Sequence, residues 1–274
     1  MAMSTSVAAA PRKTGNLVSD TLVIARRNLL KVLRTPQLII FNSIQPIMFT
    51  LLFRYVFGGS IQIPGLKYVD YLIPGIIVQT SLFGGAGTSI AMAEDIKAGI
   101  IDRFRSLPMA RAAVLAGRTF ADVVRLLFVI ALLFLVGTAV GFRFHNGFGP
   151  AVVAVLLCLF FGFAFLWFFA FIGMSVKDTE TAQVASFLPV FPLAFASSIF
   201  TRVSDMPGWL QVFARNQPVT KCVNAVRALT QGHDKMVKIG YPESTAKLVV
   251  QAVIWCVVII AVFAPLAINR YRKG

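Results

Sequence analysis

The chain has 274 residues, of which 57% are hydrophobic and 14% charged, and its 26 lysines and arginines outnumber 11 aspartates and glutamates. Soluble domains have about 45–50% apolar and about 25% charged residues, so the composition argues against a soluble globular protein. It also excludes a disordered chain, because such chains combine charge with low hydrophobicity. A net charge of +15 often indicates a nucleic-acid partner. Here the basic residues lie between long apolar stretches, which is typical of a membrane protein, and no nucleic acid is expected.

Residues 1–36 come before the first apolar stretch and are expected to be cytoplasmic. Residues 1–16 are polar and rich in Ala and Ser, which predicts a disordered tail. Residues 18–34 place Val, Leu and Ala on one helical face and most of their charged residues opposite. That pattern predicts an amphipathic helix in the headgroup plane, and the alternative is a basic anchor without a mechanical role. The basic residues of this interfacial helix are Arg26, Arg27, Lys31 and Arg34.

Six stretches have the length and composition of membrane-spanning helices, which need about 20 mostly apolar residues. They are residues 37–57, 71–92, 120–141, 150–176, 182–200 and 248–268. We therefore expect an all-α polytopic membrane protein with six transmembrane helices, whose transmembrane domain is residues 37–268. Basic residues are more numerous on the connections that share a side with the N-terminus, and the tail 269–274 adds to them. The positive-inside rule then predicts a multi-pass protein of the inner (plasma) membrane with both termini cytoplasmic.

Small residues and charges interrupt two of these stretches. The cluster Gly84-Gly85-Ala86-Gly87 predicts close helix packing or a local bend in the second span. Asp122 and Arg125, at the inner end of the third span, are expected to pair with each other or to face the cytosolic side.

Catalytic and nucleotide-binding motifs are missing from the sequence. No GxxxxGK[ST] phosphate-binding loop occurs, so any ATP hydrolysis is expected in a partner subunit. The three cysteines form no CxxC or Cys/His cluster, and no metal site is predicted. The two histidines lie in outer connections and the spans lack paired carboxylates, so we expect no enzyme. An intramembrane enzyme stays as an alternative, as does an ion-gradient transporter, although the latter would want buried acids along its spans.

The connection between the second and third spans carries an amphipathic pattern. Ile96, Ile100, Phe104 and Leu107 recur at helical spacing among charged residues, and Pro108 ends the pattern. A short helix of this kind suits docking onto a soluble partner. The alternative is an ordinary solvated loop.

The connection after the fifth span predicts two short helices on the outer side. Pro207 and Pro218 are placed to begin them, and Asp205 is expected to cap the first. The pair fits a re-entrant hairpin, and the alternative is an external cap domain in which Trp209 anchors at the interface. In the fifth span the prolines predict a functional bend, and three phenylalanines share a face. The candidate pathway residues there are Phe187, Pro189, Phe191, Pro192 and Phe195.

Taken together, these motifs closely resemble those of ABC-2-type permeases, most of all the daunorubicin-resistance type of drug-exporter permease. The resemblance rests first on Asp95 to Gly99, Asp102 to Pro108, Arg111 and Gly117-Arg118. It continues in matching order at Leu29 to Lys31, Thr35-Pro36, Gln45-Pro46, Phe57 to Gly59, Tyr71 to Gly75, Met206 to Trp209, Gln217 to Val219, Arg227, Phe263 to Pro265 and Tyr271 to Lys273. It covers nearly the whole chain.

The resemblance implies a membrane subunit of an ATP-driven exporter that moves a hydrophobic or amphipathic drug or lipid. A separate ATP-binding subunit, holding ATP and Mg, would dock on the interfacial helix and on the coupling helix between spans two and three, so this chain needs no cofactor. A second permease copy or paralogue would complete the pathway, and the outer hairpin would gate its exit. The implied coupling residues are Asp95, Lys97, Gly99, Asp102, Arg103, Phe104, Arg105 and Pro108, and those of the gate are Pro207, Trp209, Gln217 and Pro218. Export of a cell-wall glycolipid or polysaccharide is the alternative within this architecture.

Overall fold

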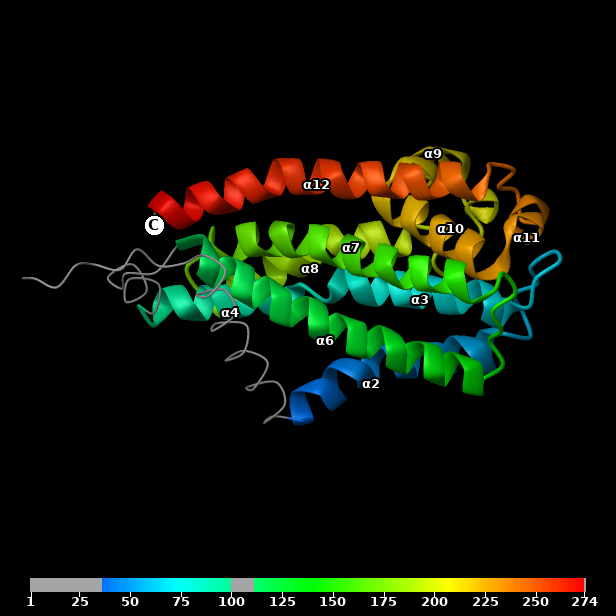
Figure 1. Cartoon of the computed structure of the whole chain (residues 1–274), viewed down its shortest axis with the longest axis horizontal. Helices are drawn as coiled ribbons and strands as arrows, with labels where there is room; N and C mark the ends of the chain where they lie inside the picture. The colour runs from blue at the N-terminus through cyan, green and yellow to red at the C-terminus, as the bar shows by residue number, and fades with distance from the viewer. Residues whose placement is uncertain (1–35, 100–110, 274) are drawn as a thin grey trace, which may run out of the picture.

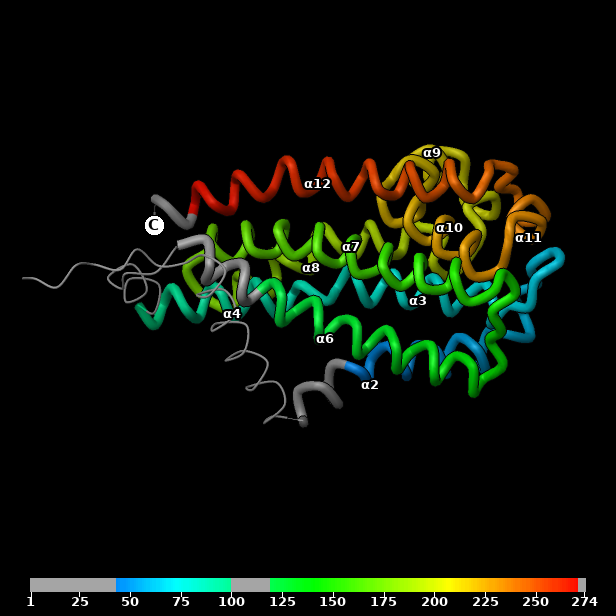
Figure 2. The backbone as a smooth tube through the Cα atoms, viewed as in Figure 1, coloured from blue at the N-terminus to red at the C-terminus, as the bar shows by residue number. Residues whose placement is uncertain are grey.

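The structure, a computed structural model, describes residues 36–99 and 111–273, with side chains for residues 43–99 and 119–270. Within these ranges the chain is helical, apart from loops and one isolated bridge between Ile63 and Leu66. The longer helices run side by side along one axis and form an elongated bundle (Figure 1 and Figure 2). The chain is therefore an all-α protein, as its sequence predicts.

The helices of the described residues succeed one another along the chain. In chain order they are α2 (Pro36–Leu52), the π-helix η1 (Phe53–Phe57), α3 (Tyr68–Phe83), α4 (Ala86–Lys97), α6 (Arg111–Ala139), α7 (Phe148–Gly173), α8 (Thr179–Phe195), the 3-10 helix η2 (Val203–Asp205), α9 (Gly208–Asn216), α10 (Pro218–Gln231), α11 (His233–Lys238) and α12 (Thr245–Lys273).

Four helical stretches of the described chain are long and apolar enough to cross a membrane: Tyr68–Lys97, Thr119–Ala139, Phe148–Gly173 and Thr245–Arg270. They coincide with the second, third, fourth and sixth expected spans. At the first and fifth positions lie α2, which continues without a break into η1, and α8, which has 17 residues. A helix of that length covers about 25 Å, less than the roughly 30 Å of a bilayer core. The chain is thus polytopic, while six spans stay a prediction.

Helix α7 lies at the centre of the bundle and packs along α12, α4, α10, α3 and α6. Its Phe161 and Phe169 side chains are fully buried, with Phe165 nearly so between them. Residues four apart lie on one helical face, so these three rings form the inward side of α7. Close packing of this kind holds membrane helices together, because lipid chains are as apolar as the side chains themselves.

The glycine cluster divides the second span into α3 and α4. Gly84 and Gly85 lie between the two helices, and a Cβ atom on Gly85 would overlap the ring of Phe169 in α7. Only a residue without a side chain permits this close approach. The predicted close packing is confirmed, and the structure adds that the helix is interrupted at the cluster.

The two short helices after α8 begin where expected, but one cap differs. Pro218 is the first residue of α10, and the Gln217 side chain accepts a hydrogen bond from Val219 N at 3.1 Å. The expectation that Asp205 caps α9 is wrong, because α9 begins after Pro207 without a side-chain cap. Asp205 is instead held by Arg202, three residues earlier across the η2 turn, at 3.0 Å.

Candidate functional site

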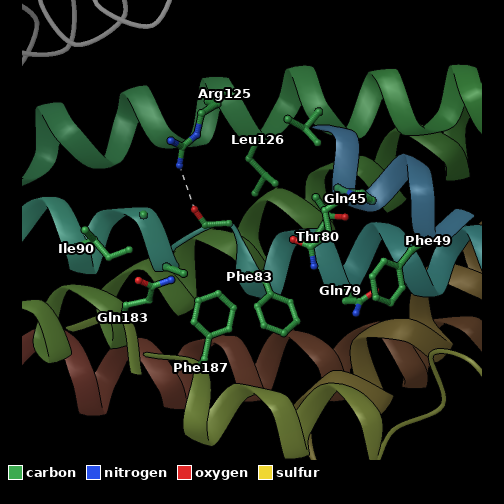
Figure 3. Close-up of a pocket in the computed structure, with 15 residues that line it drawn as sticks. Gln45, Phe49, Gln79, Thr80, Phe83, Ile90, Arg125, Leu126, Gln183 and Phe187 are labelled. Atoms are coloured by element: carbon green, nitrogen blue, oxygen red, sulfur yellow. Dashed lines mark hydrogen bonds between the residues drawn. The ribbon is translucent and has the colours of Figure 1, made fainter. Parts of the chain in front are cut away.

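A cavity of about 290 Å³ lies between α2, the α3–α4 break, α6 and α8. Figure 3 shows aromatic and polar side chains from these helices lining it together. The aromatic residues are Phe49, Phe83 and Phe187, and the polar ones are Gln45, Gln79, Thr80, Arg125 and Gln183. Apolar walls with a few polar groups are the usual composition of a small-molecule site.

A charged pair on α6 borders this cavity and holds the helix break. Arg125 lies 3.1 Å from Asp122 Oδ1 and donates a hydrogen bond to the Gly84 carbonyl oxygen at 3.1 Å (Figure 3). That carbonyl needs a donor from outside the helix, since the Thr88 N–H bonds to Gly85 instead. The Thr88 hydroxyl in turn donates to Asp122 Oδ2 at 2.7 Å. The predicted pairing of Asp122 with Arg125 is confirmed, and it ties α6 to both sides of the break.

A series of phenylalanine rings leads away from the cavity along α8 towards the end of α2. Its ring pairs and centroid distances are Phe83–Phe187 5.6 Å, Phe187–Phe191 6.0 Å, Phe191–Phe195 5.3 Å, Phe195–Phe200 5.5 Å and Phe53–Phe200 4.4 Å. The shared face predicted for the three α8 phenylalanines is confirmed. Phe191 and Phe195 are each about half exposed, so the series forms an open aromatic surface.

The two prolines predicted to bend α8 lie inside the helix, which continues to Phe195. Each lacks an N–H, so Pro189 and Pro192 leave two carbonyl groups of the preceding turn without a helical donor. Both side chains are exposed. A functional bend at these positions stays a prediction.

The non-helical residues 196–201, which follow α8, are held by a buried arginine that sequence reasoning did not single out for a site. Arg227 of α10 is fully buried. It donates to the carbonyl oxygens of Tyr71 at 2.9 Å, Ser198 at 2.6 Å and Ile199 at 3.0 Å. Its guanidinium also lies 3.4 Å above the centre of the Tyr71 ring. Unwound backbone within a membrane protein needs such donors, because lipid supplies none.

Further side chains complete this network. The Tyr71 hydroxyl shares its one proton between the carbonyl oxygens of Ser198 at 3.0 Å and Thr201 at 2.8 Å. Gln217 donates to those of Leu193 at 2.9 Å and Ala196 at 3.2 Å. The segment that follows α8 is therefore fixed from both α3 and α10.

The four residues predicted for the outer gate divide into two groups. Gln217 and Pro218 are buried at the start of α10, within the network. Pro207 and Trp209 lie away from it, and the Trp209 side chain is 77% exposed. One sequence signal points to Arg227: it follows Val223 by four residues and so falls on the apolar face of the predicted helix.

The predicted docking elements lie only partly within the described residues. Asp95 and Lys97 are in the last turn of α4, and Gly99 follows with φ +65°. This left-handed conformation is a common way to end a helix and favours glycine. The remaining predicted contacts lie outside the described residues: Asp102, Arg103, Phe104, Arg105 and Pro108 of the loop, and Arg26, Arg27, Lys31 and Arg34 of the interfacial helix.

Comparison with known proteins identifies the family. The pattern of the ABC-2 type transporter family matches residues 19–230. The chain belongs to this family. The permease is 33% identical over 256 residues to the daunorubicin resistance ABC transporter permease protein of Streptomyces coeruleorubidus, covering 93% of this chain and 87% of that one.

More distant relatives carry similar names. A probable doxorubicin resistance ABC transporter permease protein of Mycobacterium tuberculosis is 23% identical over 216 residues, or 78% of each chain. A putative transport permease of Cyanophora paradoxa is 24% identical over 220 residues, covering 77% of this permease and 74% of the relative. The relatives are permease subunits rather than enzymes, and this chain is an integral membrane protein of the same kind.

Proposed function

We propose that this permease is the membrane subunit of an ATP-driven exporter for a hydrophobic or amphipathic drug or lipid, coupled to a separate ATP-binding subunit. The observation that carries the proposal is the cavity at the α3–α4 break. Three phenylalanine rings face carboxamide groups there, between helices that span or approach the membrane. Aromatic rings pack against flat apolar ligands, and the amides suit polar substituents on such ligands. The names of the relatives, which include daunorubicin and doxorubicin resistance permeases, point to the same class of cargo.

The proposal places the protein in the plasma membrane. It includes six spans, with both termini in the cytoplasm. Helix α2 continues into η1, and α8 packs against α4, α7 and α3 (Figure 1). In this proposal α2 and α8 are the first and fifth spans and lie at the cavity. Helices α9 and α10 form the outer hairpin. A second permease copy or paralogue would complete the pathway. The aromatic series from Phe187 to Phe53 is the proposed route from the cavity towards the outer surface.

Transport in inside-out vesicles tests this function. The permease is co-expressed with an ATP-binding subunit, and ATP-dependent uptake of daunorubicin is followed by its fluorescence. Phe187→Ala is expected to raise KM for the drug several-fold with little loss of basal ATP hydrolysis, because it removes one aromatic wall. Leu188→Ala is the matched control, since Leu188 neighbours Phe187 but is 73% exposed.

Two results would contradict the proposal as stated. Absence of ATP-dependent uptake while the ATP-binding subunit hydrolyses ATP would exclude daunorubicin as cargo. Equal changes in KM for the two variants would remove the cavity from the transport path. If a lipid-linked saccharide stimulates ATP hydrolysis and aromatic amines do not, the chain is instead an exporter of cell-wall glycolipid or polysaccharide.

A further inference from the structure

A second cavity, of about 570 Å³, lies at the end of the bundle where α12 begins. It shares no lining residue with the cavity at the α3–α4 break. Its walls come from the segment after α8, the junction of α9 and α10, and the connection between α11 and α12. Four basic side chains, Arg202, Arg215, Lys221 and Lys238, line it, with Glu243 as the carboxylate on the lining.

Three of the four basic side chains have no carboxylate partner among the described residues, and the lining keeps an excess of positive charge over Glu243. Arg202 is paired with Asp205, and Arg215 donates to the Gln211 side chain at 3.2 Å. In the part of the chain that the structure describes, no carboxylate lies within ion-pair distance of Arg215, Lys221 or Lys238. Like charges gathered around one cavity repel one another, so an anionic ligand there would stabilise them.

Helix α9 places the cavity at the membrane surface. Three apolar side chains of this helix are left uncovered by the described chain: Trp209, Val212 and Phe213 are 77%, 66% and 45% exposed. In an integral membrane protein such side chains contact lipid, and tryptophan favours the depth of the headgroups. Arg215 follows on the same helix and lines the cavity, which therefore opens near headgroup depth.

A positively charged cavity is unusual on the outer side of a membrane protein. In the proposed topology the cavity lies on the outer surface, where the positive-inside rule disfavours lysine and arginine in short connections. Four basic residues around one cavity on that side call for a specific reason, and a negatively charged ligand at headgroup depth provides it.

We propose that this cavity binds the phosphodiester headgroup of an anionic phospholipid from the outer leaflet. Arg215, Lys221 and Lys238 would donate charge-assisted hydrogen bonds to the phosphate oxygens, while the acyl chains lie along the apolar edge of α9. The inference rests on the proposed topology but not on the proposed cargo, because the lipid is a bound ligand at a different site.

The position of the cavity connects lipid binding to the hairpin. Asn224 lines the cavity, and its side-chain oxygen accepts a hydrogen bond from the Ser198 hydroxyl at 3.1 Å, within the network that fixes residues 196–201. A ligand that binds only the folded state stabilises that state. Bound lipid is therefore expected to raise the unfolding temperature of the permease.

The test measures lipid binding to the purified full-length permease in neutral detergent micelles. Dioleoylphosphatidylglycerol is titrated in, and binding is read from retained lipid by native mass spectrometry and from the unfolding temperature. The double variant Arg215→Gln/Lys221→Gln is expected to bind at least about tenfold more weakly, since two charge-assisted contacts are lost. Lys235→Gln/Lys247→Gln is the matched control, because it removes the same charge nearby from residues that do not line the cavity.

Four outcomes would overturn the inference: no saturable binding, equal weakening in the control, equal binding of dioleoylphosphatidylcholine, or a response to inorganic phosphate that equals the response to the lipid. The last would assign the cavity to free phosphate. A negative lipid titration would not change the drug-uptake result in vesicles. A negative drug-uptake result would likewise not change the lipid titration, so the two proposals can be told apart.

Discussion

The positive charge of Arg227 is buried inside the protein. Backbone carbonyl groups and the face of an aromatic ring interact with it there. Its planar guanidinium reaches three carbonyl oxygens in different directions and stacks on Tyr71. A lysine ammonium is a single point of charge and cannot reproduce this fork. The geometry therefore depends on arginine in particular rather than on a positive charge.

Arg227→Lys is expected to lower the stability of the permease by about 2–3 kcal/mol, because buried carbonyl groups lose their donors. The measurement is thermal unfolding in detergent, followed by tryptophan fluorescence. Arg202→Lys is the control, since the Arg202–Asp205 pair is partly exposed and worth no more than about 1 kcal/mol. Equal losses in the two variants would contradict the role assigned to the network.

Gly85 offers a second test at the scale of one residue. Gly85→Ala is expected to cost about 1–3 kcal/mol, because the new methyl group must displace the Phe169 ring. Gly87→Ala is the matched control: it lies two residues along in α4, where an added methyl group would meet nothing within 4 Å, and should be neutral or stabilising. Thermal unfolding again provides the measurement, and a loss at Gly87 as large as that at Gly85 would argue against close packing.

These two residues also show what the sequence can and cannot predict. Four small residues in an apolar stretch indicate packing by their chemistry alone, and the structure agrees at Gly85. Charge places Arg227 among the basic residues of an expected outer connection, and helical spacing puts it on an apolar face, but neither says which segments surround it. Its burial depends on Tyr71 and Ser198, which are 156 and 29 residues away in the chain. Local patterns carry no information on such a meeting of distant segments.

At the scale of elements, the pair Asp122–Arg125 joins α6 to the break between α3 and α4. Both side chains are largely buried, with 15% and 23% of their surface exposed. Removing one partner leaves the other charge uncompensated, which costs more than removing both.

A double-mutant cycle measures this connection. Arg125→Met alone is expected to destabilise the permease more than the double variant Asp122→Asn/Arg125→Met, with a coupling energy of about 1–3 kcal/mol. The single variant Asp122→Asn completes the cycle, and its amide can still bond to Thr88. Additive effects on the unfolding free energy would show that the two residues act separately.

Element ends are less predictable than element positions. Apolar runs locate each long helix, since length and hydropathy are local properties. Helix α8 ends at Phe195 rather than at residue 200, because the backbone after it bonds to side chains from α3 and α10. Spacing alone predicts that Asp205 caps α9. In the structure the Asp205 carboxylate forms an ion pair with Arg202 instead.

At the scale of the whole molecule, the order of helices predicts a topology that chemical labelling can test. The native cysteines Cys158, Cys222 and Cys256 are fully buried, so a membrane-impermeant maleimide should give little background. The exposed positions Ser60 and His233 are expected to be outside, and Lys177 inside.

Ser60→Cys and His233→Cys should therefore be labelled in intact cells, whereas Lys177→Cys should be labelled only after permeabilisation. Each variant is compared with the unmodified protein as its control. Labelling of Lys177→Cys in intact cells would reverse the proposed orientation, and labelling of Ser60→Cys and His233→Cys from opposite sides would exclude six spans.

The arrangement of helices around the two cavities is beyond sequence reasoning. The cavity at the break joins α2, α3, α6 and α8, and only Phe187 of the predicted pathway residues lines it. Which faces of separate helices meet depends on packing throughout the bundle, whereas hydropathy records only which segments enter the membrane.

The network around residues 196–201 has a mechanical consequence for α3. Buried hydrogen bonds join the start of α3 to α10 and to this segment, so a displacement of one of the three strains its bonds to the other two. The other end of α3 meets α4 at the Gly84–Gly85 break, about 24 Å from the first residue of α3, where Arg125 bonds to the Gly84 carbonyl oxygen. Gly84 and Arg125 both line the cavity, so a ligand bound there would contact the junction through which α3, anchored at its other end by this network, meets α4.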